Sequence, residues 1–313
     1  MAESESPELP RGIALAWGVA ADPQRGPKRE MSVERIVEAA VDIADAEGIG
    51  AVSMAAVAKR LGFTPMSLYR YVSAKDDLLL LMQEEATGTP SPAHREAEGW
   101  REKFLVLFRE QVAVYVRHPW LLSLPISGSP ITPNSSLWLE AGLSALDGEN
   151  LLSEERLALA LAITGAARWN GMVLAGYDAE ARRTGMTPAE LSARESALFD
   201  VVISADEFPR LRAVIDDGVF ATGGDPFRFG VDRLLDGVAS YLAGRAEGAP
   251  SAVVSEWTGQ DDADIIGDKR YRAAVKAVGD AEKALRQAEK VLRQARRAQE
   301  RAAREARSRS ASA

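Results

Sequence analysis

The sequence predicts an all-α protein: an N-terminal three-helix unit with a helix-turn-helix, a larger helical domain, and an extra C-terminal helix. Apolar residues recur at helical spacing in most segments, and no segment alternates convincingly between apolar and polar residues as a strand would. Prolines fall between the helical segments or at their starts, where a missing N–H costs little. The chain has 313 residues, 46% hydrophobic and 27% charged, which is the balance of a soluble globular protein with about two domains.

Composition argues against most kinds of active site. The chain has no cysteine, which excludes disulfides and thiolate chemistry, and its two histidines, His94 and His118, are too few for a typical histidine metal site. We recognise no nucleophile–base pair, carboxylate pair or phosphate-cradling glycine loop. An enzyme with a helical body is therefore disfavoured, and we expect no catalytic residue, no metal and no cofactor.

The sequence also predicts a cytoplasmic protein with no membrane partner. The segment MAESESPELP is acidic and lacks the charged-then-apolar pattern of a signal peptide. No stretch approaches the roughly 18 uninterrupted apolar residues that a membrane span requires.

Charge is distributed unevenly along the chain. The net charge is −8, but the residues from Asp268 onward hold 14 Lys/Arg and 6 Asp/Glu, a local charge of +8. The preceding 267 residues carry −16, although residues 22–75 are nearly neutral, with 8 basic and 7 acidic side chains. Because charges are screened beyond about 8–10 Å, the acidic total does not exclude binding to a polyanion.

The first helices are delimited by capping residues. Residues 1–30 are rich in Pro, Gly and Glu and are expected to form a flexible tail. Ser32 is a candidate N-cap for an amphipathic helix that Gly48 ends, and this helix opens a domain predicted to span residues 31–86.

Two short helices and a fourth helix complete that domain. Ser53 is a candidate N-cap for a short helix that Gly62 breaks, and Pro65 stands at the start of a third helix. Residues 73–76 fit a capping box before a fourth helix over residues 78–82.

Residues 53–71 have the proportions of a DNA-binding helix-turn-helix. Four apolar residues can lock its two helices against the first one: Val57, Leu61, Phe63 and Leu68. This packing leaves a row of polar and aromatic side chains that suit base edges and phosphates. The candidate DNA contacts are Ser53, Thr64, Pro65, Met66, Ser67, Tyr69, Arg70, Tyr71 and Lys75.

Lys75 carries an electrostatic argument of its own. A cation in the first turn of a helix opposes the helix dipole and costs a few tenths of a kcal/mol. A phosphate at this position would be bound jointly by the ammonium group and by the first-turn N–H groups. The lysine is therefore easier to explain when DNA is present.

Residues 32–86 resemble the N-terminal domain of the TetR/AcrR family of bacterial repressors, which are similar to the tetracycline repressor. The resemblance is carried by RIVEAAVDIADAEG and VAKRLGFTPMSLYRYVSAKDDLL, most specifically by Leu68, Tyr69, Val72 and Lys75 in the pattern Leu-Tyr-x-x-Val-x-x-Lys. The segments RGIALAWG and RHPW also resemble a branch of this family, so the similarity extends over roughly residues 12–245.

The resemblance implies that several of the candidate contacts match DNA-contacting positions of the family: Ser53, Thr64, Ser67, Tyr69, Tyr71 and Lys75. Met54 and Met66 depart from the pattern, since they stand where polar base readers could be. The resemblance further implies a homodimer on a palindromic double-stranded operator, released by an unknown small-molecule effector. An activator would share these features, and a three-helix unit without DNA is the structural alternative.

Residues 97–245 would then form the ligand-binding and dimerisation domain, with helical patterns at 97–117, 134–146, 153–182, 188–203, 207–217 and 227–244. Residues 153–178 and 227–244 are candidates for the dimer interface, and Gly165, Gly171 and Gly176 would allow helices to approach closely there. Ordinary intrachain core is the alternative for both segments.

Aromatic and polar residues are the candidates for the ligand pocket: Tyr115, His118, Trp120, Trp138, Trp169, Asn170 and Met172. His118 would serve equally as a hydrogen-bond partner at a helix end, and Trp138 and Trp169 as core residues. Asn170 is the stronger candidate, because a buried amide needs partners.

The C-terminal region predicts a linker over 246–268 and a basic, Ala-rich helix over 269–308. Ala274, Val278 and Ala281 begin an apolar seam with alternating four- and three-residue spacing, but its alanines make a weak coiled coil. The helix could be solvated, could pair with a second copy, or could touch DNA through its arginines. A DNA-packaging protein that uses this tail is a further alternative.

Overall fold

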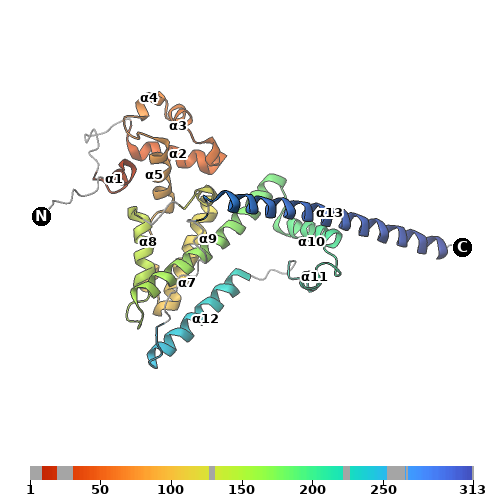
Figure 1. Ribbon diagram of the computed structural model, residues 1–313. Coiled ribbons are helices and arrows are strands. Elements are labelled where there is room, and N and C mark those ends of the chain that lie inside the picture. Colours follow the sequence, from red (N-terminus) through yellow and green to blue (C-terminus); the bar gives the residue numbers. More distant parts are fainter. Residues whose placement is uncertain are drawn as a thin grey trace. The chain divides into compact units, whose positions relative to one another are not determined.

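The computed structural model describes residues 9–19, 31–126, 131–220, 226–251, 265 and 267–311, and within these residues every regular element is a helix (Figure 1). The chain divides into two compact units, Met1–Ala252 and Val253–Ala313. The helices of the first unit are α1 (Arg11–Ala16), α2 (Val33–Glu47), η1 (Ile49–Ala51), α3 (Met54–Leu61), α4 (Pro65–Leu68), α5 (Lys75–Thr87), α6 (Ala93–Glu96), α7 (Gly99–Arg117), η2 (Pro119–Ser123), α8 (Pro133–Ser144), α9 (Ser153–Thr184), α10 (Pro188–Val202), α11 (Pro209–Asp216) and α12 (Pro226–Ala246), and the second unit contains α13 (Lys269–Ala311).

The ends of α2 and α3 are set by the capping residues that the sequence predicts. The Ser32 Oγ accepts a hydrogen bond from the Arg35 N–H at 3.3 Å, and Gly48 ends α2 with a φ of 84°. The Ser53 Oγ accepts from the Ala56 N–H at 3.1 Å, and Gly62 ends α3 in the left-handed region with a φ of 78°. These caps fix where the turn between α3 and α4 begins.

The N-terminal helices pack around one apolar core. Ile36 of α2, Val57 of α3 and Leu68 of α4 are fully buried in it, together with Val72 and Leu78. Residues from η2 join the same core: Trp120 and Leu121. The DNA-reading candidates are therefore held by a core that also includes part of the following domain.

The expectation of a flexible tail over residues 1–30 is wrong for its central part. Residues 11–16 form α1, which packs against α5, and Ile13 is buried. The helix has fewer than two full turns, so its apolar period is too short to recognise, and its stability comes from burial rather than propensity. Residues 1–8 and 20–30 lie outside the described residues.

The third and fourth helices also differ from the prediction. α4 ends at Leu68, and the chain continues as a turn in which the Tyr71 N–H bonds to the Leu68 carbonyl three residues back, at 2.9 Å. The capping box over residues 73–76 does not form: Ala74 is the N-cap of α5, which has no side-chain cap.

The larger domain has a second core between α7, α8, α9 and α12, filled by Phe104, Leu107, Leu146, Ile163 and Leu235. α7 and α9 pack along much of their length. A Cβ at Gly171 would lie 2.6 Å from the Cβ of Tyr115, so this glycine permits the close approach of α9 to α7 within the chain. At Gly165 and Gly176 a Cβ would meet nothing within 4 Å.

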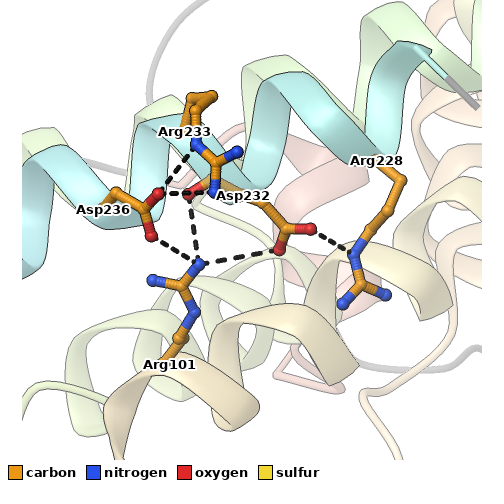
Figure 2. A network of polar contacts seen from close by, with 5 residues as sticks. All are labelled: Arg101, Arg228, Asp232, Arg233 and Asp236. Atoms are coloured by element: carbon orange, nitrogen blue, oxygen red, sulfur yellow. Dashed lines mark hydrogen bonds and ion pairs between the residues drawn. The ribbon is translucent and has the colours of Figure 1, made fainter.

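A network of ion pairs joins α12 to α7 (Figure 2). The Arg101 guanidinium of α7 lies 2.9 Å from the Asp236 carboxylate and donates to the Asp232 carbonyl at 3.1 Å. Arg228 and Arg233 pair with Asp232 and Asp236 at 3.0 and 2.6 Å, respectively. Arg101 therefore binds a turn of α12 whose carboxylates are already oriented by neighbouring arginines.

The start of α9 is joined to the end of α12 by Glu155. Its buried carboxylate accepts hydrogen bonds from the hydroxyls of Ser251 and Tyr241, and from the Leu152 N–H at 2.8 Å. These donors, Ser251 above all, lower the pKa of Glu155 to about 2.

Of the helices described, α9 alone combines the length and hydropathy that a membrane span requires. Long helices of soluble proteins meet the same criteria, so a single example is weak evidence. Only 28% of its most apolar window is buried within the chain. The exposed apolar face of α9 thus requires another explanation.

The second unit is the long helix α13. The Asp268 carboxylate accepts from the N–H groups of Arg270 and Tyr271, both at 2.8 Å, and so caps its start. The helix runs three residues beyond the predicted end. Its described side chains are exposed or half-exposed, including those of Val278 and Leu285 on the apolar seam.

Candidate nucleic-acid interface and ligand cavity

The helix-turn-helix presents an exposed row of side chains on α4 and the turn after it. Leu68 is fully buried, whereas the neighbouring side chains of Met66 and Tyr69 are 73% and 46% exposed. Thr64, Pro65 and Arg70 are also exposed. One buried anchor therefore holds a short helix whose other side chains are available to a partner.

Three other candidate contacts have structural partners. The exposed Ser53 uses its Oγ as the cap of α3, and the half-buried Ser67 donates to the Thr64 carbonyl at 2.6 Å. Tyr71 is half-buried and packs against the N-terminal core. The expectation that Tyr71 is left entirely to solvent or DNA is therefore wrong.

The two methionines that depart from the family pattern have different environments. Met54 is buried in the N-terminal core, because it follows the N-cap on the inner side of α3, so it is not available to read bases. Met66 is the most exposed large apolar side chain of this region and is available for an apolar contact.

Lys75 is exposed and is the first residue of α5. The N-cap of α5, Ala74, provides no side-chain acceptor, so the first-turn N–H groups receive no side-chain cap. The exposed ammonium group and these N–H groups together form a suitable environment for a phosphate oxygen. The absence of a cap at Ala74 is a feature that the sequence analysis missed by expecting a capping box.

A cavity of about 470 Å³ lies where the N-terminal helices meet the larger domain. It is lined from α5, α7, α8 and α9, from the segment that follows η2, and from Ile13 of α1. The lining is largely apolar and aromatic, and its polar groups include Gln111, Thr164 and Arg168. This volume and this lining are typical of a small-molecule site.

Two of the seven predicted pocket residues line this cavity. Tyr115 and Trp138 do so, and the Trp138 indole N–H also donates to the Gly88 carbonyl at 3.0 Å. Trp169 and Met172 are 57% and 44% exposed on α9 and do not line it. Asn170 is buried, and its Oδ1 has no hydrogen-bond partner, but it also lies outside the cavity lining.

His118 and Trp120 contact the N-terminal helices instead of the cavity. The His118 Nδ1 lies 2.8 Å from the Asp45 carboxylate, and the Trp120 indole N–H donates to the same carboxylate at 2.7 Å. Asp45 belongs to the last turn of α2. His118 and Trp120 therefore link the two domains. They serve as hydrogen-bond partners at the end of a helix and do not line the cavity.

The polar side chains that line the cavity are not among the residues predicted from the sequence. The Gln111 amide N lies 3.4 Å from the Thr164 hydroxyl, and the buried Oε1 of Gln111 has no partner. The Arg168 guanidinium donates to the Leu122 carbonyl at 3.1 Å and lies 5.7 Å from the centre of the Tyr115 ring. Gln111 directly follows Arg109 and Glu110, so its neighbours in the sequence give no signal that it faces a cavity.

The fold and this site define a class of protein: a DNA-binding transcriptional regulator that carries a cavity-bearing helical domain. Residues 36–82 match the family described as bacterial regulatory proteins, tetR family, and residues 91–242 match the tetracyclin repressor-like C-terminal domain. The chain belongs to the tetR family of bacterial regulators. Proteins of this family are not enzymes; they are soluble and generally cytoplasmic in bacteria.

Curated relatives agree with this assignment. The chain is 37% identical to the HTH-type transcriptional repressor DrrR1 of Streptomyces coeruleorubidus, over 79% of this chain and 92% of the relative. It is 24% identical to an uncharacterized HTH-type transcriptional regulator of Mycobacterium bovis, over 78% of this chain and 94% of the relative.

The fold is similar to that of a possible TetR family transcriptional regulator from Streptomyces coelicolor. That match has a TM-score of 0.54 and 21% identity, and covers 67% of this chain and 100% of the other.

Proposed function

We propose that this regulator is a homodimeric repressor that binds a palindromic operator in the bacterial cytoplasm and is released by a small molecule. The observation that carries the DNA-binding part is the exposed row on α4, where Met66, Tyr69 and Arg70 surround the buried anchor Leu68. A relative that shares 37% of its residues is named as a repressor, which supports this direction of control.

The candidate DNA contacts divide into two kinds. Thr64, Pro65, Met66 and Tyr69 would meet base edges and thymine methyl groups in the major groove, as the second helix of a helix-turn-helix does. Arg70 would bind phosphate oxygens, and the exposed Lys75 would do so together with the uncapped N-terminus of α5. The hydroxyls of Ser53, Ser67 and Tyr71 would add phosphate contacts at the edges of this surface.

The exposed face of α9 supports dimerisation. Leu161, Gly165, Trp169, Met172 and Gly176 share this face at helical spacing, and all five are exposed within a single chain. On α12, Phe229 is 63% exposed. A second copy of the chain would remove this apolar surface from water, and the two glycines would allow the helices to approach closely.

The cavity of about 470 Å³ is the candidate effector site, with Tyr115 and Trp138 in its wall. The buried Oε1 of Gln111 has no partner and would accept a hydrogen bond from a donor on the effector. An effector that binds the DNA-incompetent arrangement more tightly would shift the population toward it and release the operator. The Asp45 contacts to His118 and Trp120 are one physical link between the two domains.

Two substitutions on the DNA-reading surface test this function. The native chain, Tyr69→Ala and Lys75→Ala are compared by fluorescence anisotropy on an operator selected from a random duplex pool and on unselected duplex DNA. Tyr69→Ala should weaken binding to the operator by about 1–3 kcal/mol. Lys75→Ala should weaken binding to both DNAs and lower the salt slope by about one.

Val201→Ala, at an exposed position on α10 outside both the DNA-reading surface and the proposed dimer face, is the control for nonspecific damage to the fold. Its affinity for both DNAs should equal that of the native chain. Native affinity for the operator in both the Tyr69 and the Lys75 variants would contradict the proposed reading surface.

A further inference from the structure

Helix α1 forms part of the wall of the effector cavity. Ile13 lines the cavity beside residues of α5, such as Leu80, and is 7% exposed. The family matches begin at residue 36, so α1 lies outside the part of the chain that they cover. A wall residue is thus supplied by a helix that precedes both matched family domains.

The same helix rests directly on the first turn of α5. A Cβ at Gly12 would lie 2.8 Å from the Asp77 Oδ1 and 3.3 Å from the Asp77 Cα, so the backbone of α1 contacts α5 with no room for a side chain. Asp77 is two residues from Lys75, the candidate phosphate contact. α1 therefore touches both the cavity and the end of α5 that faces DNA in the proposed function.

The end of α1 is attached to another part of the cavity wall. The Trp17 indole N–H donates to the Ile131 carbonyl at 2.7 Å, and Ile131 lines the cavity. The Trp17 side chain is 49% exposed, so burial alone would not keep its ring in one orientation. The hydrogen bond to Ile131 supplies that orientation. Any occupant that displaces Ile131 or Ile13 must also move α1 or break this bond.

We propose that α1 is the effector-sensing wall of the regulator. Ile13 contacts the bound small molecule, Trp17 holds the segment before α8 against it, and the Gly12–Asp77 contact transmits displacement of α1 to the first turn of α5. The inference rests on the proposed function, in which occupancy of this cavity controls DNA binding. A change at Ile13 should alter both the cavity and the DNA affinity, because the adjacent residue of α1, Gly12, lies against Asp77.

The wall contact is tested with the dye 8-anilinonaphthalene-1-sulfonate as the probe. Arg168 is the only charged side chain among the described lining residues, so an anionic aromatic molecule matches the cavity. Ile13→Trp in the full chain places an indole in the cavity wall and should weaken dye binding about ten-fold, as a loss of about 1.4 kcal/mol would. Val19→Trp introduces the same side chain at an exposed position after α1 and should leave dye affinity unchanged.

The coupling between the cavity wall and DNA binding is tested with the same variants on a selected operator in the absence of dye. Ile13→Trp should weaken operator binding several-fold, because the indole fills the cavity as a bound small molecule would. Val19→Trp should bind the operator like the native chain. Trp17→Phe removes only the indole N–H from a half-exposed ring and should weaken dye binding less than Ile13→Trp does. It serves as the second variant should Ile13→Trp fail to fold.

The outcomes separate the two proposals. Equal dye affinity in native, Ile13→Trp and Trp17→Phe chains, or no dye binding by the native chain, overturns the assignment of α1 as a wall. Native operator affinity in a folded Ile13→Trp chain overturns the coupling. Failure of the native chain to prefer any selected operator over random DNA overturns the proposed function instead, and leaves the dye result to decide the role of Ile13.

Discussion

Gly171 shows how one missing side chain shapes the larger domain. It lies where α9 meets α7, and a Cβ there would stand 2.6 Å from the Cβ of Tyr115 and 3.1 Å from the Tyr115 Cδ2. Tyr115 also lines the cavity and lies under the Arg168 guanidinium. The glycine therefore sets the position of a cavity residue as well as the spacing between two helices.

Gly171→Ala should destabilise the fold by about 1–3 kcal/mol, the usual cost of overpacking a well-filled interior. The expected physical cause is a displacement of Tyr115, which should also alter dye binding in the cavity. Urea denaturation measures the first effect and dye titration the second.

Gly165→Ala is the matched control, since a Cβ there meets nothing within 4 Å in the chain. At protein concentrations where the chain is monomeric this position is exposed, and the change should raise stability by about 0.5–1 kcal/mol. Equal effects of the two substitutions would contradict the intrachain role of Gly171. A loss of stability at Gly165 that depends on protein concentration would instead point to a second copy covering this face of α9.

Among elements, the joint between α9 and α12 depends on one carboxylate. Glu155 accepts from Ser251, Tyr241 and the Leu152 N–H, and these donors hold its pKa at about 2, against an ordinary value of 4.5. Because the folded pKa is lower, the unfolded chain binds this proton more readily. The stabilisation is therefore complete above about pH 4.5 and is lost as the pH falls toward 2.

Glu155→Gln should consequently lower the midpoint of urea unfolding at pH 7, and its difference from the native chain should shrink between pH 4.5 and pH 2. Glu154→Gln changes an exposed neighbour in the same turn and serves as the control. A difference between the Glu155→Gln variant and the native chain that stays constant over this pH range would show that the carboxylate charge does not stabilise the joint.

Helices whose ends are marked by capping residues could be predicted from the sequence. Ser32, Gly48, Ser53 and Gly62 mark the ends of α2 and α3, because capping depends on residues within one turn. α1 could not be found, since six residues show no period and its stability comes from α5, which lies more than sixty residues further along the chain. The early end of α4 was missed for a similar reason, because burial of Tyr71 and Val72 competes with helix propensity.

The DNA-reading row could be predicted from the sequence better than the cavity, because its residues are close together in the chain. The DNA-reading row is local, so the exposed residues around Leu68 could be identified from spacing alone. The cavity is assembled from distant segments, and only its conspicuous aromatic residues, Tyr115 and Trp138, were found. His118 and Trp120 were assigned to it because nothing in the sequence shows that Asp45, more than seventy residues earlier, lies beside them.

At the scale of the whole molecule, the positively charged segment and the proposed operator-reading surface belong to different units. The proposed DNA-reading surface, both cores and the cavity belong to Met1–Ala252, which carries most of the acidic residues. Val253–Ala313 holds α13, and the residues from Asp268 onward contribute +8. Sequence recognition and nonspecific attraction to the phosphate backbone can therefore be separated by truncation.

Deleting residues 253–313 should preserve the ability to distinguish the operator from random DNA, because base contacts lie in the first unit under the proposed function. If α13 touches the duplex, affinity for random DNA should fall, and the salt slope should decrease by about 0.9 for each phosphate that α13 neutralises in the full chain. If α13 is solvated or pairs with a second copy, the salt slope should stay as in the full chain. Loss of binding to both DNAs in a truncated chain that retains its helical circular-dichroism spectrum would favour a packaging protein over a repressor, because a packaging protein would bind DNA through this basic tail.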